Sequence, residues 1–222
     1  MSITRLKQDF FSHFARVGKA LGSGNRLELL EHLAQGERSV DQLAAAAELS
    51  VANTSQHLQQ LRRAGLVVNR REGLNVFYTL SGDEVIPLLS ALQHVAERHI
   101  GDVEKLVNTY LVARDKLEPV PQGELLQRLR RGEVTLLDVR PAAEYRAGHL
   151  AGAINVPLAD LSTVSETFNN DKDIVAYCRG PFCILAFDAV AQLRHKGFNA
   201  MRLAGGFPEW KAAGLPIEVS AT

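Results

Sequence analysis

The stretch DIVAYCRGPFCILAFDAV, residues 173–190, contains both cysteines of the 222-residue chain and decides the fold of its C-terminal half. It begins with an apolar run from Ile174 to Tyr177, continues through a loop with glycine and proline, and ends in helix-forming residues. This order predicts a strand, a short loop from Cys178 to Cys183, and a helix. A strand that is apolar on both faces is typical of a parallel sheet covered by helices.

The same alternation of short apolar runs and helical segments fills the rest of this half. The pattern predicts strands at residues 134–140, 153–157, 173–178 and 199–204, and helices at residues 124–132, 142–148, 183–197 and 208–214, with one more helix between residues 157 and 173. Strands that alternate with helices form the parallel sheet of an α/β fold, and chemistry in such sheets gathers just past the C-terminal ends of the strands. Cys178 follows such a strand, so a reactive group is expected there.

The loop after Cys178 leads directly into a helix, which favours an acidic thiol. Backbone N–H groups that converge at a helix N-terminus create a region of positive potential. We expect this potential to lower the pKa of the Cys178 thiol, so that a nucleophilic thiolate is present at neutral pH. The alternative is a cysteine that serves only as a small buried apolar residue.

Three segments of this half resemble signatures of the rhodanese sulfurtransferase family, over about residues 118 to 220: LLDVRPAAEYRAGHLAGAINVP, YCRGPFC and LAGGFPEWKAAGLP. The resemblance implies that Cys178 takes a sulfane sulfur from thiosulfate, a polysulfide or a persulfide and passes it to a thiol acceptor. It implies that Arg179, Gly180 and Phe182 bind the donor, with no cofactor and no metal. The family positions that we interpret as structural are Asp138, Arg140, Glu144, His149, Gly205, Gly206 and Trp210.

Two loop residues depart from the family pattern. Pro181 stands where glycine is common and removes a backbone donor, which argues against efficient turnover. Cys183 stands where Ser, Thr or Arg is common, and a second thiol there can attack a persulfide on Cys178, expel sulfide and close a disulfide. Bridging needs Cα atoms within about 7 Å, which the spacing leaves open.

Related phosphatases and arsenate reductases have a Cys-x5-Arg loop, and Ile184 in the arginine position argues against phosphoryl chemistry.

Residues 39–80, SVDQLAAAAELSVANTSQHLQQLRRAGLVVNRREGLNVFYTL, predict a DNA-binding unit. Helical apolar spacing breaks at Ser50, a good N-cap, and resumes until Gly65, which predicts two short helices joined by a tight turn. Two runs rich in Val, Phe, Tyr and Thr then predict a β-hairpin, which completes the plan of a winged helix-turn-helix. An ordinary solvated helix is the alternative. The side chains that we expect to contact DNA bases or phosphates are Asn53, Thr54, Ser55, Gln56, His57, Gln59, Arg62, Arg70 and Arg71.

The segment LSVANTSQHLQQLRRAGLV and the wing ending in FYTL resemble the ArsR family of small dimeric bacterial repressors, over about residues 15 to 85. Many members sense metals through cysteines on the first helix of the pair, whereas the corresponding stretch here, VDQLAAAAEL, has none. A second family site uses carboxylates and histidines on the C-terminal helix. His94 and His99 do not share one helical face, so we interpret His94, Glu97, His99 and Glu104 as surface or interface residues.

A near-heptad apolar series continues beyond the wing. It predicts one long helix whose stripe packs against a second copy of the chain, although domain core is a competing explanation for part of it. The members of the series are Val85, Leu89, Leu92, Ala96, His99, Val103, Leu106 and Tyr110. A dimer also suits a DNA reader, because two half-sites multiply weak contacts.

Charge composition and the prolines near residue 119 complete the prediction of domains and location. The 25 basic and 25 acidic residues balance, so any DNA contact needs a local patch. Without a signal peptide or a membrane-spanning run, we expect a cytoplasmic protein. The stretch EPVPQGE predicts a join between an ArsR-type winged helix DNA-binding and dimerisation domain, residues 1–117, and a rhodanese-like domain, residues 118–222. The fold class is therefore multidomain α and β: a mostly α winged helix-turn-helix with a β-hairpin wing, then an α/β rhodanese-like domain with a parallel sheet.

Together the two halves predict a homodimeric transcriptional regulator, a repressor of operator DNA. Its rhodanese domain is expected to sense reactive sulfur species or oxidants through Cys178 and Cys183. One alternative is an active thiosulfate or polysulfide sulfurtransferase with an attached DNA-binding domain. Another is arsenite or metal sensing through the two thiols.

Overall fold

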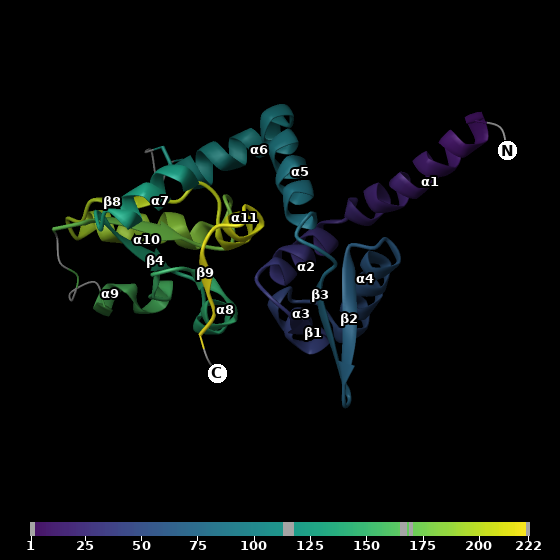
Figure 1. The fold of residues 1–222 in the computed structure, drawn as a ribbon, viewed down its shortest axis with the longest axis horizontal. Coiled ribbons are helices and arrows are strands. Elements are labelled where there is room, and N and C mark those ends of the chain that lie inside the picture. Colours follow the sequence, from purple (N-terminus) through teal and green to yellow (C-terminus); the bar gives the residue numbers. More distant parts are fainter. Residues whose placement is uncertain (1–2, 113–117, 165–167, 169–170, 221–222) are drawn as a thin grey trace. The chain divides into compact units, whose positions relative to one another are not determined.

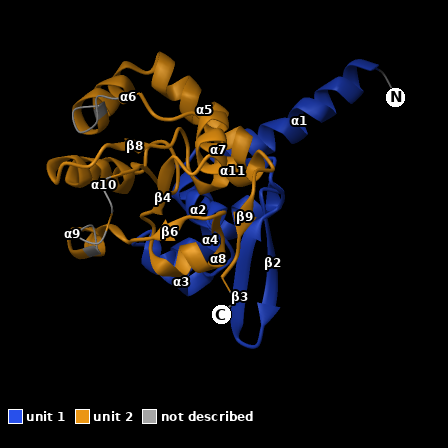
Figure 2. Cartoon of the chain, turned by 60° about the vertical axis from the view of Figure 1, so that its left-hand side comes forward, with its two compact units in different colours: residues 1–85 blue, residues 86–222 orange. Residues whose placement is uncertain are grey.

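The computed structural model describes residues 3–112, 118–164, 168 and 171–220, and it divides into two compact units, Met1–Val85 and Ile86–Thr222 (Figure 2). The boundary that the sequence predicts between residues 117 and 118 adjoins residues 113–117, which lie outside the described residues. That boundary stays a prediction. Among the described residues, no helix is both long enough and apolar enough to cross a bilayer.

The first unit is a helical layer with a three-stranded antiparallel sheet of order β1-β3-β2. In Figure 1 the paired strands β2 and β3 form a long hairpin beside α4. The elements are α1 (Ile3–Leu21), α2 (Gly24–Ala34), β1 (Arg38–Ser39), α3 (Val40–Ala46), α4 (Val51–Arg63), β2 (Val67–Glu72) and β3 (Asn75–Leu80). The predicted winged helix-turn-helix is confirmed.

Local capping explains where the two central helices begin. The Ser39 hydroxyl accepts a hydrogen bond from the Gln42 backbone N–H, and the Gln42 side-chain oxygen accepts one from the Ser39 backbone N–H, so α3 starts with a capping box. The Ser50 hydroxyl accepts from the Asn53 backbone N–H at the start of α4. The hairpin turn places Gly73 at a φ of 58°, a left-handed conformation that glycine adopts at little cost.

The second unit contains a four-stranded parallel sheet of order β6-β4-β7-β8. Its main elements are α5 (Val85–His99), α6 (Gly101–Leu106), η1 (Val107–Val112), α7 (Gln122–Arg130), β4 (Val134–Asp138), α8 (Ala142–Ala147), β6 (Ile154–Asn155), α9 (Leu161–Val164), β7 (Asp173–Tyr177), α10 (Ile184–His195), β8 (Ala200–Arg202) and α11 (Phe207–Ala212). A 3-10 turn, η2 (Leu158–Asp160), precedes α9. The sequence did not predict the small antiparallel pair of β5 (His149–Leu150) and β9 (Ile217–Glu218).

The sheet is covered on both faces, as the apolar run of β7 predicts. Ile174 and Ala176 pack in one core cluster, with residues of α10 such as Leu193. Val175 and Tyr177 pack in the other, with residues of α7 and α11. Successive side chains of a strand point to opposite faces, so β7 anchors both cores and fixes the position at which its C-terminal end leaves the sheet.

The prediction of one long helix from Val85 to Tyr110 is wrong. Helix α5 ends at His99, and Ile100 adopts an extended conformation with φ −109° and ψ 103° before α6 begins. Gly101 follows directly; glycine inside a helix is unfavourable because of its conformational freedom. Asp102 and Glu104 then favour a new helix N-terminus. The apolar stripe therefore does not follow one helical axis.

Candidate functional site

The cysteine loop lies at the C-terminal end of β7, as predicted. Cys178 follows Tyr177 and is fully buried in the core cluster that contains Ala176 and Ala189. Cys183 is the N-cap residue of α10 and is half-buried. The two sulfur atoms form a disulfide, with the Cα atoms 6.2 Å apart. This separation lies inside the range that disulfides bridge, so the loop geometry allows the two cysteines to meet.

Backbone contacts hold the loop against the start of α11. The Cys183 N–H donates to the Gly180 carbonyl oxygen at 3.2 Å, and the Phe207 N–H donates to the Cys178 carbonyl oxygen at 3.1 Å. Gly206 fits closely beneath them, because a Cβ added there would lie 2.5 Å from both the Cys178 oxygen and the Gly180 nitrogen. Only a residue without a side chain allows this approach.

Arg179 is held by the carboxylate of Glu144, in the first turn of α8. Its Nε donates to both carboxylate oxygens of Glu144, at 3.0 and 3.2 Å, and its Nη2 donates to Oε1 at 2.8 Å. Glu144 is buried, and such a forked pair is geometrically specific. The predicted role of Arg179 in binding an anionic donor therefore requires sharing its guanidinium with Glu144, and stays a prediction. The lowered thiol pKa of Cys178 concerns the reduced protein and is likewise untested.

A second, fully buried ion pair supports the strands beneath the loop. Arg140 contacts Asp138 at 2.6 Å and donates to the Gly148 carbonyl oxygen at 2.7 Å. The Tyr177 hydroxyl donates to Asp138 at 2.6 Å and accepts from the Leu150 N–H at 3.1 Å. Burial opposes the charge on Arg140, but the hydrogen bond and charge of Asp138 raise its pKa. Burial, followed by the Asp138 charge, raises the pKa of Tyr177. This network fixes the end of β7 from which Cys178 departs.

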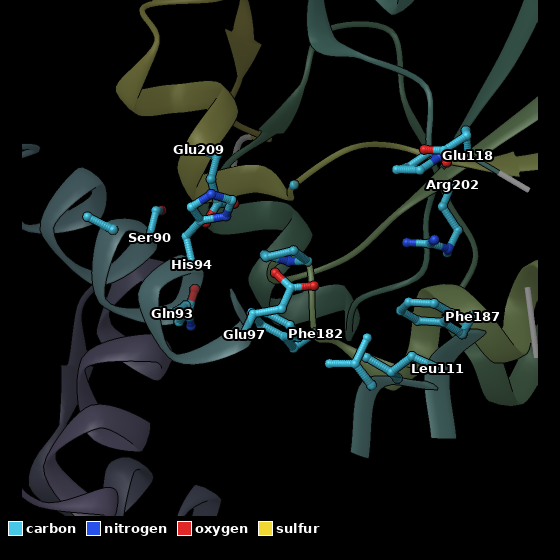
Figure 3. A pocket seen from close by; sticks show the side chains of 15 residues that line it. Ser90, Gln93, His94, Glu97, Leu111, Glu118, Phe182, Phe187, Arg202 and Glu209 are labelled. Carbon is cyan, nitrogen blue, oxygen red and sulfur yellow. The ribbon is translucent and has the colours of Figure 1, made fainter. Parts of the chain in front are cut away.

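A cavity of about 780 Å³ lies against the loop, within the second unit (Figure 3). Pro181 and Phe182 of the loop contribute to its wall, whereas neither cysteine lines it. The other lining residues are Ser90, Ala91, Gln93, His94 and Glu97 of α5, Val107 and Leu111 of η1, and Glu118, Pro119, Phe187, Arg202, Gly205 and Glu209. Its size is that of a small-molecule binding site.

The predicted DNA-binding residues of α4 differ in exposure. Gln56, Gln59 and Arg62 are exposed, and Asn53, Ser55 and His57 are half-buried. Thr54 is the exception: its side chain lies in the core, because it is one helical turn before the buried Leu58. Its expected place on the DNA-facing surface is corrected accordingly.

The two predicted wing arginines also differ. Arg71 is exposed, whereas Arg70 binds both carboxylate oxygens of Glu37, with its Nε 2.7 Å from Oε1, and also contacts Glu72. The hydrogen bond from Arg70 lowers the pKa of Glu37, and those from Glu37 and Glu72 raise the pKa of Arg70. In the structure the Arg70 guanidinium is therefore shared between two carboxylates of the first unit.

The predicted histidines and glutamates of α5 and α6 divide between the surface and the cavity, which His94 and Glu97 line. His94, His99 and Glu104 are exposed and Glu97 is half-buried. Across the described residues, no group of three or more His, Cys, Asp or Glu side chains is arranged to hold a metal ion.

Comparison with known proteins identifies both halves. Residues 23–68 match the model of the family "Bacterial regulatory protein, arsR family", and residues 121–213 match "Rhodanese-like domain". Over 97% of its length the chain is 44% identical to the HTH-type transcriptional regulator Rv0324 of Mycobacterium tuberculosis, of which it covers 94%. The chain belongs to the ArsR family of transcriptional regulators. In this regulator the DNA-binding helix-turn-helix precedes a rhodanese-like domain, so both predicted resemblances are confirmed.

Each half of the regulator also has relatives of its own. The C-terminal half is 34% identical to a sulfurtransferase of Allochromatium vinosum, over 44% of this chain and 92% of that protein. The N-terminal half is 42% identical to the solution structure of a homodimeric winged helix-turn-helix DNA-binding domain from Mycobacterium bovis. That likeness covers 42% of this chain and 87% of the other, with a TM-score of 0.40.

The sequence did not predict the partners of two residues at the regulator's site. Glu144 and Gly206 were interpreted as structural residues, for ion pairing, turns and packing; in the structure Glu144 holds the loop arginine and Gly206 contacts the loop backbone. The motifs around these residues, EYRAG and AGGF, marked both positions as part of the family pattern, but a motif does not show which residues they contact.

Proposed function

We propose that this ArsR-family regulator is a cytoplasmic repressor that senses reactive sulfur through Cys178 and Cys183. In the first step the Cys178 thiolate attacks the outer sulfur of a persulfide RS–SH. A Cys178–sulfur bond forms, the RS–S bond breaks, and the electron pair leaves with RS⁻, which takes up a proton. In the second step the Cys183 thiolate attacks Sγ of Cys178 and expels HS⁻, which leaves the disulfide. Two thiols are oxidised and the sulfane sulfur is reduced to sulfide.

The observation that supports this proposal is the position of the pair. Cys178 directly follows the C-terminal end of strand β7 in a rhodanese-like sheet, and the Cα atom of Cys183, its disulfide partner, lies 6.2 Å from that of Cys178. The second thiol is therefore within reach of a sulfur on the first. A sulfurtransferase needs only one such cysteine, whereas a switch benefits from a resolving thiol that converts a transient persulfide into a lasting disulfide.

The cavity supplies a route by which the loop could influence DNA binding. Pro181 and Phe182 line the same space as residues of α5, and α5 begins at Val85, shortly after the wing strand β3 ends at Leu80. A change in loop conformation on disulfide formation would therefore alter the contacts of α5, the helix that follows the wing. Switching a regulator from nearly all bound to nearly all free requires a bias of about 5.5 kcal/mol.

The proposed active species is a homodimer on double-stranded DNA. Helix α1 carries Phe10, Phe11 and Phe14 with more than half of each side chain exposed, and an apolar face of this kind is typical of an interface. Base contacts are assigned to Asn53, Ser55, Gln56, His57 and Gln59, and phosphate contacts to Arg62 and Arg71.

The test is a DNA-binding titration by fluorescence anisotropy on a fragment selected by the protein from a random library. Native protein, Cys178→Ser and Cys183→Ser are each treated with inorganic polysulfide, and intact mass is measured alongside. We expect the native protein to lose two hydrogen atoms and to bind DNA at least about tenfold more weakly. Cys183→Ser should retain an added sulfur atom, and Cys178→Ser should form neither product. Unchanged DNA affinity in a native sample that has formed the disulfide would refute the switch.

Sulfurtransferase turnover is the second candidate, favoured by the 34% identity to the Allochromatium vinosum sulfurtransferase. It predicts steady transfer of sulfur from thiosulfate to cyanide by the native protein, with no effect of the donor on DNA affinity. The resolving thiol Cys183 competes with turnover, so under this candidate Cys183→Ser should be faster than native protein in the cyanide assay.

A further inference from the structure

The charge of the cavity is unusual for a site that is to receive an anionic sulfur donor. Its lining carries three carboxylates, Glu97, Glu118 and Glu209, against one guanidinium, that of Arg202, and one imidazole, that of His94. Thiosulfate and polysulfides are dianions or monoanions, and a wall with more negative than positive charge repels them.

The loop arginine does not offset this charge. Arg179 does not line the cavity, and its guanidinium is held by the buried carboxylate of Glu144. The cavity's own cation, Arg202, lies 3.7 Å above the ring of Phe187 and is therefore fixed at one side of the space. A ligand that suits this lining carries a positive group for the carboxylates and one carboxylate for Arg202.

We propose that the cavity binds a small organic persulfide with a protonated amino group, an α-amino acid persulfide of the cysteine type, and presents it to the loop. This inference rests on the proposed function, because it names the donor for the same cysteine pair. The ammonium group pairs with Glu97, and the carboxylate pairs with Arg202.

The position of the loop fits this assignment. In Figure 3 the Glu97 carboxylate from α5 and the Phe182 ring from the loop both reach into the cavity. Phe182 directly precedes Cys183, whose sulfur is bonded to that of Cys178. A donor that packs against Phe182 therefore contacts the residue next to Cys183 in the loop, while neither cysteine itself lines the cavity. The amino group distinguishes this donor from thiosulfate and inorganic polysulfides, which have none.

Binding is tested without any sulfur chemistry. Isothermal titration calorimetry on the full-length chain compares S-methyl-L-cysteine with 3-(methylthio)propionate, which has the same thioether and carboxylate but no amino group. Native protein is compared with Glu97→Gln and with the matched control Glu104→Gln, an exposed glutamate of α6 that does not line the cavity. We expect the amino acid to bind at least about tenfold more tightly than its deamino analogue, the range of one hydrogen bond to a charged group. Glu97→Gln should abolish that preference and Glu104→Gln should keep it.

A parallel kinetic experiment separates this inference from the proposed function. Disulfide formation is followed by intact mass with cysteine persulfide and with the persulfide of 3-mercaptopropionate. A faster reaction with the amino donor, lost in Glu97→Gln, supports the inference. Equal rates and equal binding of both compounds overturn it while the sulfur switch stands. A pair that no donor oxidises overturns the switch, and the calorimetric preference is still decided by its own measurement.

Discussion

Gly206→Ala should displace the cysteine loop, and the structure gives the size of the effect. Gly206 has φ −146° and ψ −162°, an extended conformation that alanine also adopts, so the cost comes from contact alone. The added Cβ would lie 2.5 Å from the Cys178 oxygen, 2.5 Å from the Gly180 nitrogen and 2.6 Å from the Arg179 carbonyl carbon. All three are backbone atoms. Restoring ordinary contact at about 3.5 Å requires a shift of roughly 1 Å.

A shift of that size affects both stability and chemistry. Overpacking of a close-fitted site costs about 1–3 kcal/mol. The Cα atoms of Cys178 and Cys183 are 6.2 Å apart, and disulfides rarely span more than about 6.8 Å. Moving the start of the loop by roughly 1 Å can therefore exceed the reach of the disulfide.

Two measurements test this prediction. Urea unfolding followed by the fluorescence of Trp210, the single tryptophan and a buried residue of α11, reports the stability of the rhodanese-like domain. Intact mass after polysulfide treatment reports disulfide formation. Gly180→Ala is the matched control, because its added Cβ would meet only Glu209 Oε1 within 4 Å, at 3.8 Å. The reasoning is refuted if Gly206→Ala forms the disulfide at the native rate and lies within about 0.5 kcal/mol of Gly180→Ala.

Three further outcomes follow from buried charge, a raised pKa and an exposed apolar face. Asp138→Asn removes the partner of the buried Arg140 and should lower the free energy of unfolding by about 3–5 kcal/mol, measured in urea. Tyr177 has a folded pKa above its unfolded value, so its contribution is intact below about pH 10 and is lost as the pH rises further. The unfolding free energy should then fall by up to ~1.4 kcal/mol per pH unit, a slope that Tyr177→Phe reduces. Phe14→Ser should shift sedimentation from dimer toward monomer.

The apolar pattern predicted the elements that carry the site, because each element has enough consecutive residues for a pattern to be visible. The run from Ile174 to Tyr177 is buried on both faces, as expected of a central parallel strand. The pair β5 and β9 has two residues per strand, too few for any period to appear. The helix break at Ile100 was also hidden, since the apolar series continues across it and Gly101 was the one local signal.

Contacts between distant segments were beyond the sequence for a different reason. Arg179 and Glu144 are separated by 35 positions, and nothing in either motif states that their side chains meet. The spacing of the two cysteines permitted a disulfide, but the Cα separation depends on how β7 and α10 are set by their cores. Sequence identifies which residues have chemistry, whereas the packing of the sheet decides which of them touch.

The same distinction separates the two wing arginines, which the sequence treated as equivalent. Both side chains are exposed, but Arg70 is paired with Glu37 and Glu72 and lies 4.6 Å from the centre of the Phe77 ring. To contact a phosphate, Arg70 would have to break its hydrogen bonds to two carboxylates, which would offset most of the binding free energy. We therefore expect Arg71 to make the phosphate contact. We expect Arg71→Ala to weaken binding equally on selected and random DNA and to reduce the salt slope, d log K/d log[salt], by about 1 in magnitude. Arg70→Ala should leave that slope unchanged, and an equal loss of slope in both variants would show that the wing pairs open on DNA.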